Sequence, residues 1–205
     1  APKFTIDTKE PSRWRPTPPM YGDALEPHWN SMRTWVLDSC RQIPVDPPVA
    51  FSREKGSDFY KQAYQVYDIV NNLTPEQEAI AWYWDDNPFA VEVSGHLSIG
   101  KKKISPGGHW MAIAGYASKK AGSDMMESAE TYVHTACALA DAFIVCWEEK
   151  YRTNLIRPES YIKELIDPEW APVIQTPPFP EHTSGHSTVS AAAAAVLTNL
   201  YGPNF

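Results

Sequence analysis

Two basic side chains are the first residues of this sequence whose types and spacing could do chemistry. Lys150 and Arg157 lie seven positions apart, nearly two helical turns, so a continuing helix would place both on one face, about 10 Å apart along its axis. Pro158 ends such a helix directly after Arg157, which would let the two long side chains converge on one ligand. A planar guanidinium and an ammonium together suit a tetrahedral oxyanion. Taken by themselves, the two residues are also compatible with a surface lysine and an arginine that caps a helix C-terminus.

The tripeptide Ser184, Gly185 and His186 precedes an alanine-rich run and could complete an anion site. Ser184 is a good N-cap for the helix expected after it, a role that could explain this residue without any ligand. A helix N-terminus also presents free backbone N–H groups and a partial positive charge, and Gly185 would let a ligand oxygen approach the backbone closely. His186 could donate a proton to a leaving oxygen, because histidine exchanges protons near neutral pH.

The remaining histidines carry no readable site. Residues 94–96 repeat the same Ser-Gly-His tripeptide, but neither a helix nor a spaced lysine and arginine accompanies it, so we interpret it as a coincidence. His182 lies four residues before His186, a spacing that holds zinc only when both lie on one helical face, and the N-cap places His182 outside the helix. His109 and His134 have no recognisable partners. We therefore expect no metal ligand from this chain itself.

Hydrophobic spacing and capping signals predict the elements that must position these residues, and they predict a mainly helical chain without strands. Helices are expected over residues 28–40, 56–73, 74–87, 108–120, 123–153, 158–166 and 187–201. The helix after Thr74 has the sequence of a capping box with Gln77, and Gly202 should stop the last helix. Residues 88–107 are expected to form a long loop in which Lys101–Lys103 form a solvated surface.

Composition excludes several functional classes. The 205 residues are 43% hydrophobic and 21% charged, which suits a folded domain, and the net charge of −7 argues against nucleic acid as the main partner. The longest apolar run, Ala191–Leu197, is far shorter than the roughly 20 residues of a membrane span. Cys137 and Cys146 lie nine residues apart on one predicted helix and should not pair. Because the sequence begins without methionine, a tag, a signal peptide or both should have been removed; of these we favour a signal, and we expect an exported protein, periplasmic or extracellular.

The combination of these residues resembles a known family. Lys150, six residues, Arg157 and Pro158, followed by Ser184 opening a helix, resemble the first two motifs of the type 2 phosphatidic acid phosphatase and vanadium-dependent haloperoxidase superfamily. The stretch Phe179–Ser187 is similar to that family too, with threonine at position 183 where the usual pattern has proline. Trp147 and the leader Trp14–Pro19 resemble the soluble bacterial haloperoxidase-like branch, in which Trp147 would line the site.

The resemblance implies a fold and roles for the residues above. It implies an all-α helical bundle, with residues 1–54 as an extended leader carrying a short helix and residues 55–205 as the N-terminal portion of one helical domain. Lys150 and Arg157 would bind the equatorial oxygens of phosphate or vanadate. Ser184 and the backbone N–H of Gly185 would complete the cradle, and His186 would act as the general acid.

A third motif of the family is missing from these residues. That motif contains an arginine and then a histidine, which attacks phosphorus or binds vanadium, whereas no histidine or arginine follows His186 here. We therefore expect residues 1–205 to be an N-terminal fragment, cut near Phe205, whose bundle is incomplete. The expected partner is a C-terminal fragment of the same precursor that carries the third motif and packs on the apolar residues of the last helix.

Three functions remain open on these grounds. The first is a haloperoxidase that binds vanadate as its cofactor and uses peroxide to oxidise a halide. The second is an acid phosphatase that hydrolyses phosphomonoesters through a phosphohistidine and needs no cofactor. The third is a non-catalytic protein that binds a small anion. All three use the same oxyanion cradle, so the residues that are present do not separate them.

Overall fold

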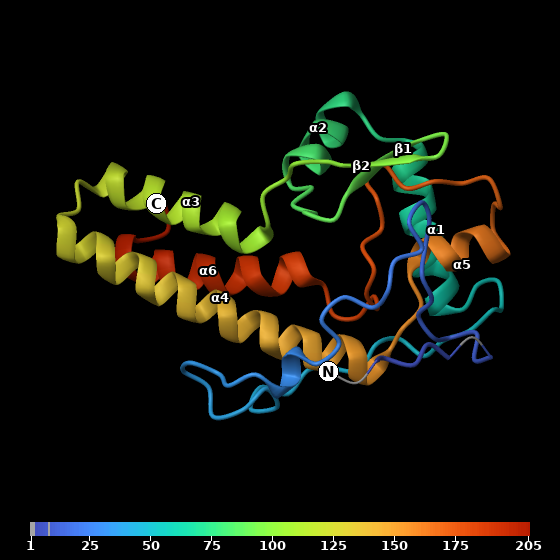
Figure 1. The fold of residues 1–205 in the computed structure, drawn as a ribbon, viewed down its shortest axis with the longest axis horizontal. Helices are drawn as coiled ribbons and strands as arrows, with labels where there is room; N and C mark the ends of the chain where they lie inside the picture. Colours follow the sequence, from blue (N-terminus) through green and yellow to red (C-terminus); the bar gives the residue numbers. More distant parts are fainter. Residues whose placement is uncertain (1–2, 8) are drawn as a thin grey trace. The chain divides into compact units, whose positions relative to one another are not determined.

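The computed structural model describes residues 3–7 and 9–205, and its backbone forms two compact units. The first unit consists of the segment that ends at Pro27 together with Asp46–Lys103 and Lys150–His182. The second consists of His28–Val45, Ile104–Glu149 and Thr183–Phe205. Within the described residues the regular structure is six α-helices, one short 3-10 helix and one two-stranded sheet (Figure 1), so the mainly helical fold is confirmed.

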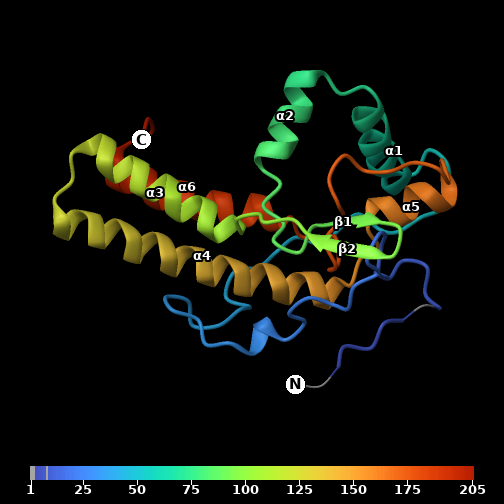
Figure 2. The same cartoon turned by 45° about the horizontal axis from the view of Figure 1, so that its top comes forward.

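The first unit contains helices α1 (Asp58–Asn71), α2 (Pro75–Tyr83) and α5 (Pro158–Leu165), and strands β1 (Val91–Ser94) and β2 (Leu97–Gly100). The predicted capping box is present: the Thr74 side chain accepts from the Gln77 N–H, and the Gln77 side chain accepts from the Thr74 N–H. Helices α1 and α5 lie side by side (Figures 1 and 2). Between them lies a buried apolar core formed by Phe59, Ala63, Ile156, Tyr161, Ile162 and Trp170.

The leader pairs with the chain that follows α4. The backbone N–H of Trp14 donates to the Asn154 carbonyl at 2.9 Å, and the Ile156 N–H donates to the Ser12 carbonyl at 2.8 Å. Asn154 has a φ of 49°, in the left-handed region that asparagine tolerates, and this turn redirects the chain from the helix into the pairing. Trp14 is completely buried, as expected for an extended arm held by aromatic contacts.

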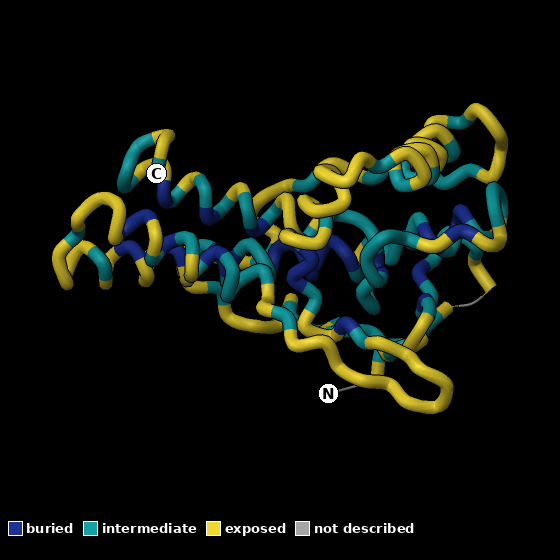
Figure 3. The backbone as a smooth tube through the Cα atoms, turned by 90° about the horizontal axis from the view of Figure 1, so that it is seen from above, coloured by how far each residue is buried: buried dark blue, intermediate teal, exposed yellow. Residues whose placement is uncertain are grey.

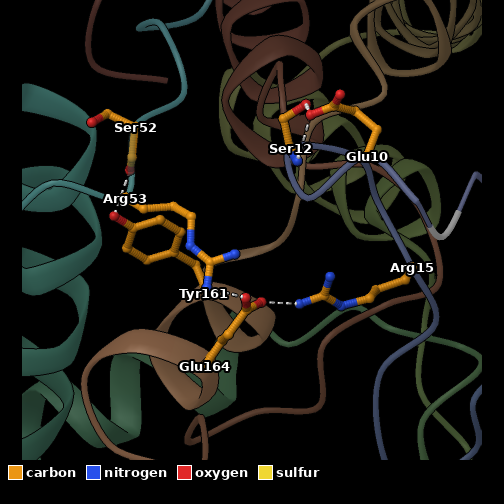
Figure 4. Close-up of polar contacts among 7 residues, drawn as sticks. All are labelled: Glu10, Ser12, Arg15, Ser52, Arg53, Tyr161 and Glu164. Atoms are coloured by element: carbon orange, nitrogen blue, oxygen red, sulfur yellow. Dashed lines mark hydrogen bonds and ion pairs between the residues drawn. The ribbon is translucent and has the colours of Figure 1, made fainter.

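A branched ion pair fixes α5 to two other segments (Figure 4). Glu164 on α5 accepts from Arg15 of the leader through one carboxylate oxygen and from Arg53 through the other, each at 2.6 Å. The Tyr161 hydroxyl, one turn earlier on α5, donates to the Ser52 carbonyl at 2.7 Å. These groups are partly exposed, so each ion pair alone contributes little, and the buried tyrosine supplies the firmer attachment.

The expected loop over residues 88–107 is wrong, because a β-hairpin occupies its middle. Strands β1 and β2 pair antiparallel with Val91 opposite Gly100 and Ser94 opposite Leu97. Gly95, with a φ of 59°, forms the tight turn, so the Ser-Gly-His tripeptide at residues 94–96 belongs to a hairpin turn. The expectation that Lys101–Lys103 form a solvated surface is also wrong for Lys103, which forms an ion pair with the buried carboxylate of Asp85.

The second unit packs α3 (Pro106–Ala121), α4 (Met125–Thr153, apart from its last four residues) and α6 (Gly185–Tyr201) side by side (Figures 1 and 2). Buried and exposed positions alternate along these helices (Figure 3), and the Trp110 indole of α3 donates to the Ser190 hydroxyl of α6 at 2.9 Å. The missing side chain of Gly115 on α3 makes room for Tyr132 on α4, since a Cβ there would lie 2.5 Å from the Tyr132 hydroxyl.

The helix expected over residues 28–40 is largely absent, because only Trp29–Ser31 form a short 3-10 helix, η1. The carboxylate of Asp141 on α4 explains the difference. It accepts hydrogen bonds from the backbone N–H groups of Trp35, Val36 and Leu37, at 2.7, 2.8 and 3.0 Å. These three donors point at one carboxylate and are therefore not available for helical bonds. Segment 28–45 is thus held on α4 by a buried charge.

Two further findings bear on the sequence analysis. None of the three cysteines forms a disulfide within the described residues, in agreement with the expectation for Cys137 and Cys146. In the part of the chain that the structure describes, none of the helices combines the length and apolarity needed to cross a bilayer.

The environment of Asp141 predicts a pH-dependent contribution to stability. Burial raises the pKa of this carboxyl, but the backbone hydrogen bonds from Trp35, Leu37 and Val36 outweigh burial and hold the pKa below its ordinary value of 3.8. A lowered pKa stabilises the folded state above pH 4, and this contribution is lost as the pH falls through the folded-state pKa. Asp141→Asn should cost about 1–3 kcal/mol in the free energy of unfolding at pH 7.

Urea unfolding at pH 7 and at pH 3 measures this effect. The difference between the wild type and Asp141→Asn should shrink at the lower pH, whereas Glu130→Gln, a change of an exposed acid on the same helix, should have little effect at either pH. An equal cost of Asp141→Asn at both pH values would contradict the assignment.

Candidate oxyanion-binding site

Lys150 lies near the C-terminal end of α4 with only 1% of its surface exposed. A buried ammonium group needs compensating partners, and its Nζ donates to the carbonyl oxygens of Pro180 and Glu181 at 2.9 and 3.0 Å. The same Nζ lies 4.8 Å from the centre of the Phe179 ring, within the range of a cation–π contact. The segment 179–181 therefore wraps around the lysine head.

Arg157 is the N-cap residue of α5, and its guanidinium reaches the same segment. Its Cζ lies 5.6 Å from the Phe179 ring centre, and Nη1 lies 2.8 Å from Oε2 of Glu181. Lys150 and Arg157 thus converge on one aromatic ring and one glutamate. They do so without the continuous helix that the seven-residue spacing assumed, because α4 ends at Thr153 and Asn154 redirects the chain. We refer to these two residues as the cation pair.

Arg157 also has a donor that the described residues leave unused. Its Nε is buried and has no hydrogen-bond acceptor within that part of the chain, although the side chain is 15% exposed. The contact with Glu181 is an ion pair by distance but is not aligned as a hydrogen bond. A buried N–H without an acceptor is costly, and a bound oxyanion would satisfy it. Phosphate and vanadate, both tetrahedral oxyanions, therefore fit the donors of the cation pair.

The second group of predicted residues opens helix α6. Ser184 is its N-cap, as expected, and the Ser184 Oγ accepts from the Ser187 N–H at 3.1 Å. This bond uses one acceptor position of the hydroxyl, and its O–H can still act as a donor. Gly185 and His186 are the first two residues of the helix, where backbone N–H groups have no helical acceptor. His186 and Ser184 are exposed, so a ligand can reach this helix start from solvent.

An aromatic cluster supports the start of α6. Trp147 on α4 is buried and lies against Gly185, since a Cβ on that glycine would be 3.8 Å from the indole ring. Trp29 of η1 and Phe143 complete the cluster, with ring centres 5.0 and 5.5 Å from that of Trp147 and 5.8 Å from each other. Segment 28–45 therefore contributes an aromatic residue to the packing directly behind the helix start.

The structure places the predicted residues in two groups. The cation pair belongs to the first unit, whereas Trp147, Ser184, Gly185 and His186 belong to the second. Within each unit the predicted residues are brought together around shared neighbours. The Nε2 of His182 lies 3.0 Å from the Asp46 carbonyl, outside any helix. Among the residues that the structure describes, no three histidine, cysteine or acidic side chains cluster as metal ligands.

Sequence reasoning missed three supporting residues. Phe179 and Glu181 lie in the stretch that resembles the family motif. Nothing in their spacing indicates that the Phe179 ring faces both cations, or that Glu181 contacts Lys150 through its backbone carbonyl and Arg157 through its carboxylate. Trp29 lies 118 positions before Trp147, and no local pattern connects the two rings. In each case the information is tertiary.

Comparison with known proteins defines the class. A family model described as the VCPO second helical-bundle domain matches residues 130–169 and 165–205, which include the cation pair and all of α6. The chain belongs to the vanadium haloperoxidase-like superfamily, and the resemblance stated from its motifs is confirmed.

One solved structure is similar over the whole chain. It is described as the crystal structure of the first bacterial vanadium-dependent iodoperoxidase, and it shares 51% sequence identity with a TM-score of 0.92. The match covers 100% of this chain and 48% of that protein, so the chain spans about half the length of the relative. The helical-bundle fold is therefore shared over this half. No curated protein sequence gives a significant match.

The aromatic cluster predicts a measurable role for Trp29. Trp29→Ala should remove two ring contacts behind Trp147 and cost about 2–4 kcal/mol of stability. Because Trp147 packs on Gly185, the amide hydrogens of Ser187 and Thr188, which donate to Ser184, should also exchange faster with solvent. Chemical unfolding and hydrogen exchange of the variant measure the two effects.

Trp35→Ala is the matched control, since this tryptophan lies in the same segment but is 61% exposed. It should cost less than about 1 kcal/mol and leave exchange at the start of α6 unchanged. Trp29→Phe should recover part of the loss. If Trp29→Ala and Trp35→Ala alter exchange at α6 to the same extent, Trp29 does not support that helix start.

Proposed function

We propose that this chain supplies the oxyanion cradle of a vanadium-dependent haloperoxidase, in which vanadate is held by the cation pair and by the start of α6. The observation that carries the proposal is the geometry of the cation pair: two cationic heads meet at Phe179, and Arg157 keeps a buried N–H without an acceptor. The superfamily and the 51% identical iodoperoxidase support vanadate as the oxyanion.

Each residue has a role that follows from its donors. Lys150 would neutralise charge on one oxygen of the ion, and its orientation is fixed by the two carbonyls that it already contacts. Arg157 donates Nε to a second oxygen while Glu181 restrains the far side of the guanidinium. The Ser184 hydroxyl and the Gly185 N–H donate to the same ion. The assignment of both groups to one ion rests on motif order and family, and the variants below test it.

His186 holds the proton that a leaving oxygen requires. It lies at the second position of α6, where the backbone is fixed by the Ser184 cap. Bound vanadate supplies a Lewis-acidic centre at which hydrogen peroxide oxidises a halide ion. Beside such a centre His186 would act as the general acid, holding a proton for a leaving oxygen.

The covalent ligand of vanadium is proposed to come from outside residues 1–205. These residues contain no histidine after His186, and the relative is about twice as long as the part that this chain matches. We therefore propose that a segment equivalent to the rest of that relative carries the third motif and completes the site. Intact mass analysis of the natural protein, together with the coding sequence downstream of Phe205, tests this part.

Activity measurements separate the haloperoxidase from a phosphatase that uses the same cradle. With the completing segment present, peroxide-dependent oxidation of iodide, bromide and chloride should require added vanadate and should be inhibited by phosphate. Hydrolysis of a phosphomonoester without vanadate, and no halide oxidation, would assign the cradle to a phosphatase. Oxyanion binding with neither activity would assign a binding protein.

Variants of the cation pair test the cradle. Arg157→Ala should weaken binding of vanadate and phosphate by about 2–4 kcal/mol, the scale of lost charge-assisted hydrogen bonds. Arg157→Lys keeps a positive charge for Glu181 but lacks Nε, so its affinity should be intermediate. Lys150→Ala should also weaken binding, although loss of the buried head will lower stability as well. Calorimetric titration and thermal unfolding measure both quantities.

Lys61→Ala is the control for a cation that is exposed and forms an ion pair with its helix neighbour Asp58. It should change neither affinity nor stability by more than about 0.5 kcal/mol. Arg157 has no part in oxyanion binding if Arg157→Ala binds vanadate as tightly as Lys61→Ala does.

Substitution of the proposed acid should separate turnover from binding. His186→Ala should abolish halide oxidation in the completed enzyme and leave vanadate affinity within about tenfold of the wild type, because the cation pair remains. Ser184→Ala should instead weaken binding and fray the start of α6. Steady-state rates and titrations on the same preparations provide the comparison. Unchanged turnover in His186→Ala would assign the proton donor elsewhere.

A further inference from the structure

The first unit contains a pocket of about 340 Å³ whose chemistry differs from that of the cation pair. Its walls are mainly apolar and come from three parts of the chain: the leader, the hairpin region and the connector, which is the stretch 166–184 between α5 and α6. The apolar side chains in the wall include Met20, Leu25, Pro88, Phe89, Val91 and Pro178. The volume is at the small end of the range for small-molecule sites. We refer to this feature as the Asp23 pocket, after the one charged residue that lines it.

The walls of the Asp23 pocket are joined by backbone hydrogen bonds. The Leu25 N–H donates to the Pro178 carbonyl at 3.0 Å, which ties the leader to the connector. The Val91 N–H donates to the Gln175 side-chain oxygen at 2.9 Å, which ties the hairpin to the connector. Three separate segments are therefore fixed around one hollow, and the pocket does not depend on a single flexible loop.

Apolar surface at the pocket is only partly covered. Phe89 is 51% exposed and Met20 is 48% exposed, although both side chains line the hollow. Ala90 and Thr176 deeper in the wall are buried. An apolar ligand seated here would remove the exposed parts of the phenylalanine and the methionine from water, which is the main source of affinity in such pockets.

The Asp23 pocket and the cation pair select ligands of opposite character. Asp23 is the only ionisable residue among the pocket's lining residues, so the pocket repels halide, phosphate and carboxylates and offers an acceptor to a neutral hydroxyl. The connector serves both places: Gln175, Thr176 and Pro178 line the pocket, and the next residue, Phe179, lies under the cation pair.

We propose that the Asp23 pocket binds a small neutral aromatic molecule with a hydroxyl group, such as a phenol, as the organic acceptor of the halogen. The ring would lie against Phe89 and Pro178, and the hydroxyl would donate to Asp23. This inference rests on the proposed function for the source of the halogen, but the binding itself does not require vanadate.

Transfer of the halogen to the phenol needs no reagent beyond peroxide, halide and one proton. Peroxide, halide and one proton give hypohalous acid and water. A ring carbon of the phenol then bonds to the halogen as the halogen–oxygen bond breaks. The ring proton leaves and combines with the released hydroxide to form water. The products are a halogenated phenol and water.

Fluorine NMR of the full chain with two matched probes tests binding directly. 4-Fluorophenol and 4-fluorobenzoate share one ring and differ in charge at neutral pH. The phenol should bind at least about tenfold more tightly, because the carboxylate of the benzoate is repelled by Asp23. Asp23→Asn should reduce this preference to less than about threefold.

Two variants alter the walls in different ways. Phe89→Ala removes the half-exposed ring, and Gly22→Leu places a side chain beside Pro178, where a Cβ would have ordinary contacts at 3.6 and 3.8 Å. Each should weaken 4-fluorophenol binding by at least about fivefold and leave vanadate affinity unchanged. Tyr83→Ala, which removes another exposed aromatic of the first unit that does not line the pocket, should change neither affinity.

The outcomes separate this inference from the proposed function. If 4-fluorophenol does not bind, or if Phe89→Ala and Gly22→Leu bind it as the wild type does, the Asp23 pocket is not an acceptor site, even when vanadate binds. If the phenol binds and responds to these variants while vanadate does not bind, the pocket stands and the oxyanion proposal fails.

Discussion

The burial of the Lys150 ammonium constrains the course of the chain around it. A charged group that is 99% shielded from water is stable only when dipoles or charges replace the water, and here the carbonyls of Pro180 and Glu181 and the face of Phe179 do so. These three residues belong to one connector, so the lysine fixes a segment that has no helical hydrogen bonds of its own. Arg157 reaches the same ring and the same glutamate. The connector therefore holds two cations, and its preceding residues form the wall of the Asp23 pocket.

Local sequence signals predicted those helices whose terminal backbone N–H groups bond to side chains a few residues away. The capping box at Thr74 and the serine cap of α6 formed as expected, since both depend on residues within three positions. The predicted helix over residues 28–40 failed because its backbone donors are taken by Asp141, more than 100 residues away. The hairpin was missed because each strand has only four residues, largely exposed on both faces, and gives a weak alternating pattern.

The candidate site was predictable where it depends on a motif interval or on the cap of a helix, although the lysine and the arginine do not share one helix, since α4 ends at Thr153 and Arg157 caps α5. Lys150 and Arg157 were found from a seven-residue interval, and Ser184 from the cap that it forms. Their neighbours could not be found in this way. Glu181 is one of many acids in an acidic chain, and Trp29 is one of eight tryptophans, so only the folded structure identifies which of them contacts the site.

The leader that pairs with residues 154–156 also has a consequence for how the chain acquires its fold. Arg13 donates to the Thr153 carbonyl across a separation of 140 residues, and closing so long a loop costs about 4 kcal/mol of chain entropy before any contact is gained. During synthesis the leader leaves the ribosome long before residues 154–156, with which it pairs, have been made. Trp14, which is completely buried in the folded chain, therefore lacks its native contacts until residues 154–156 have been made. The native contacts of the leader therefore form only after residues 153–156 have been made.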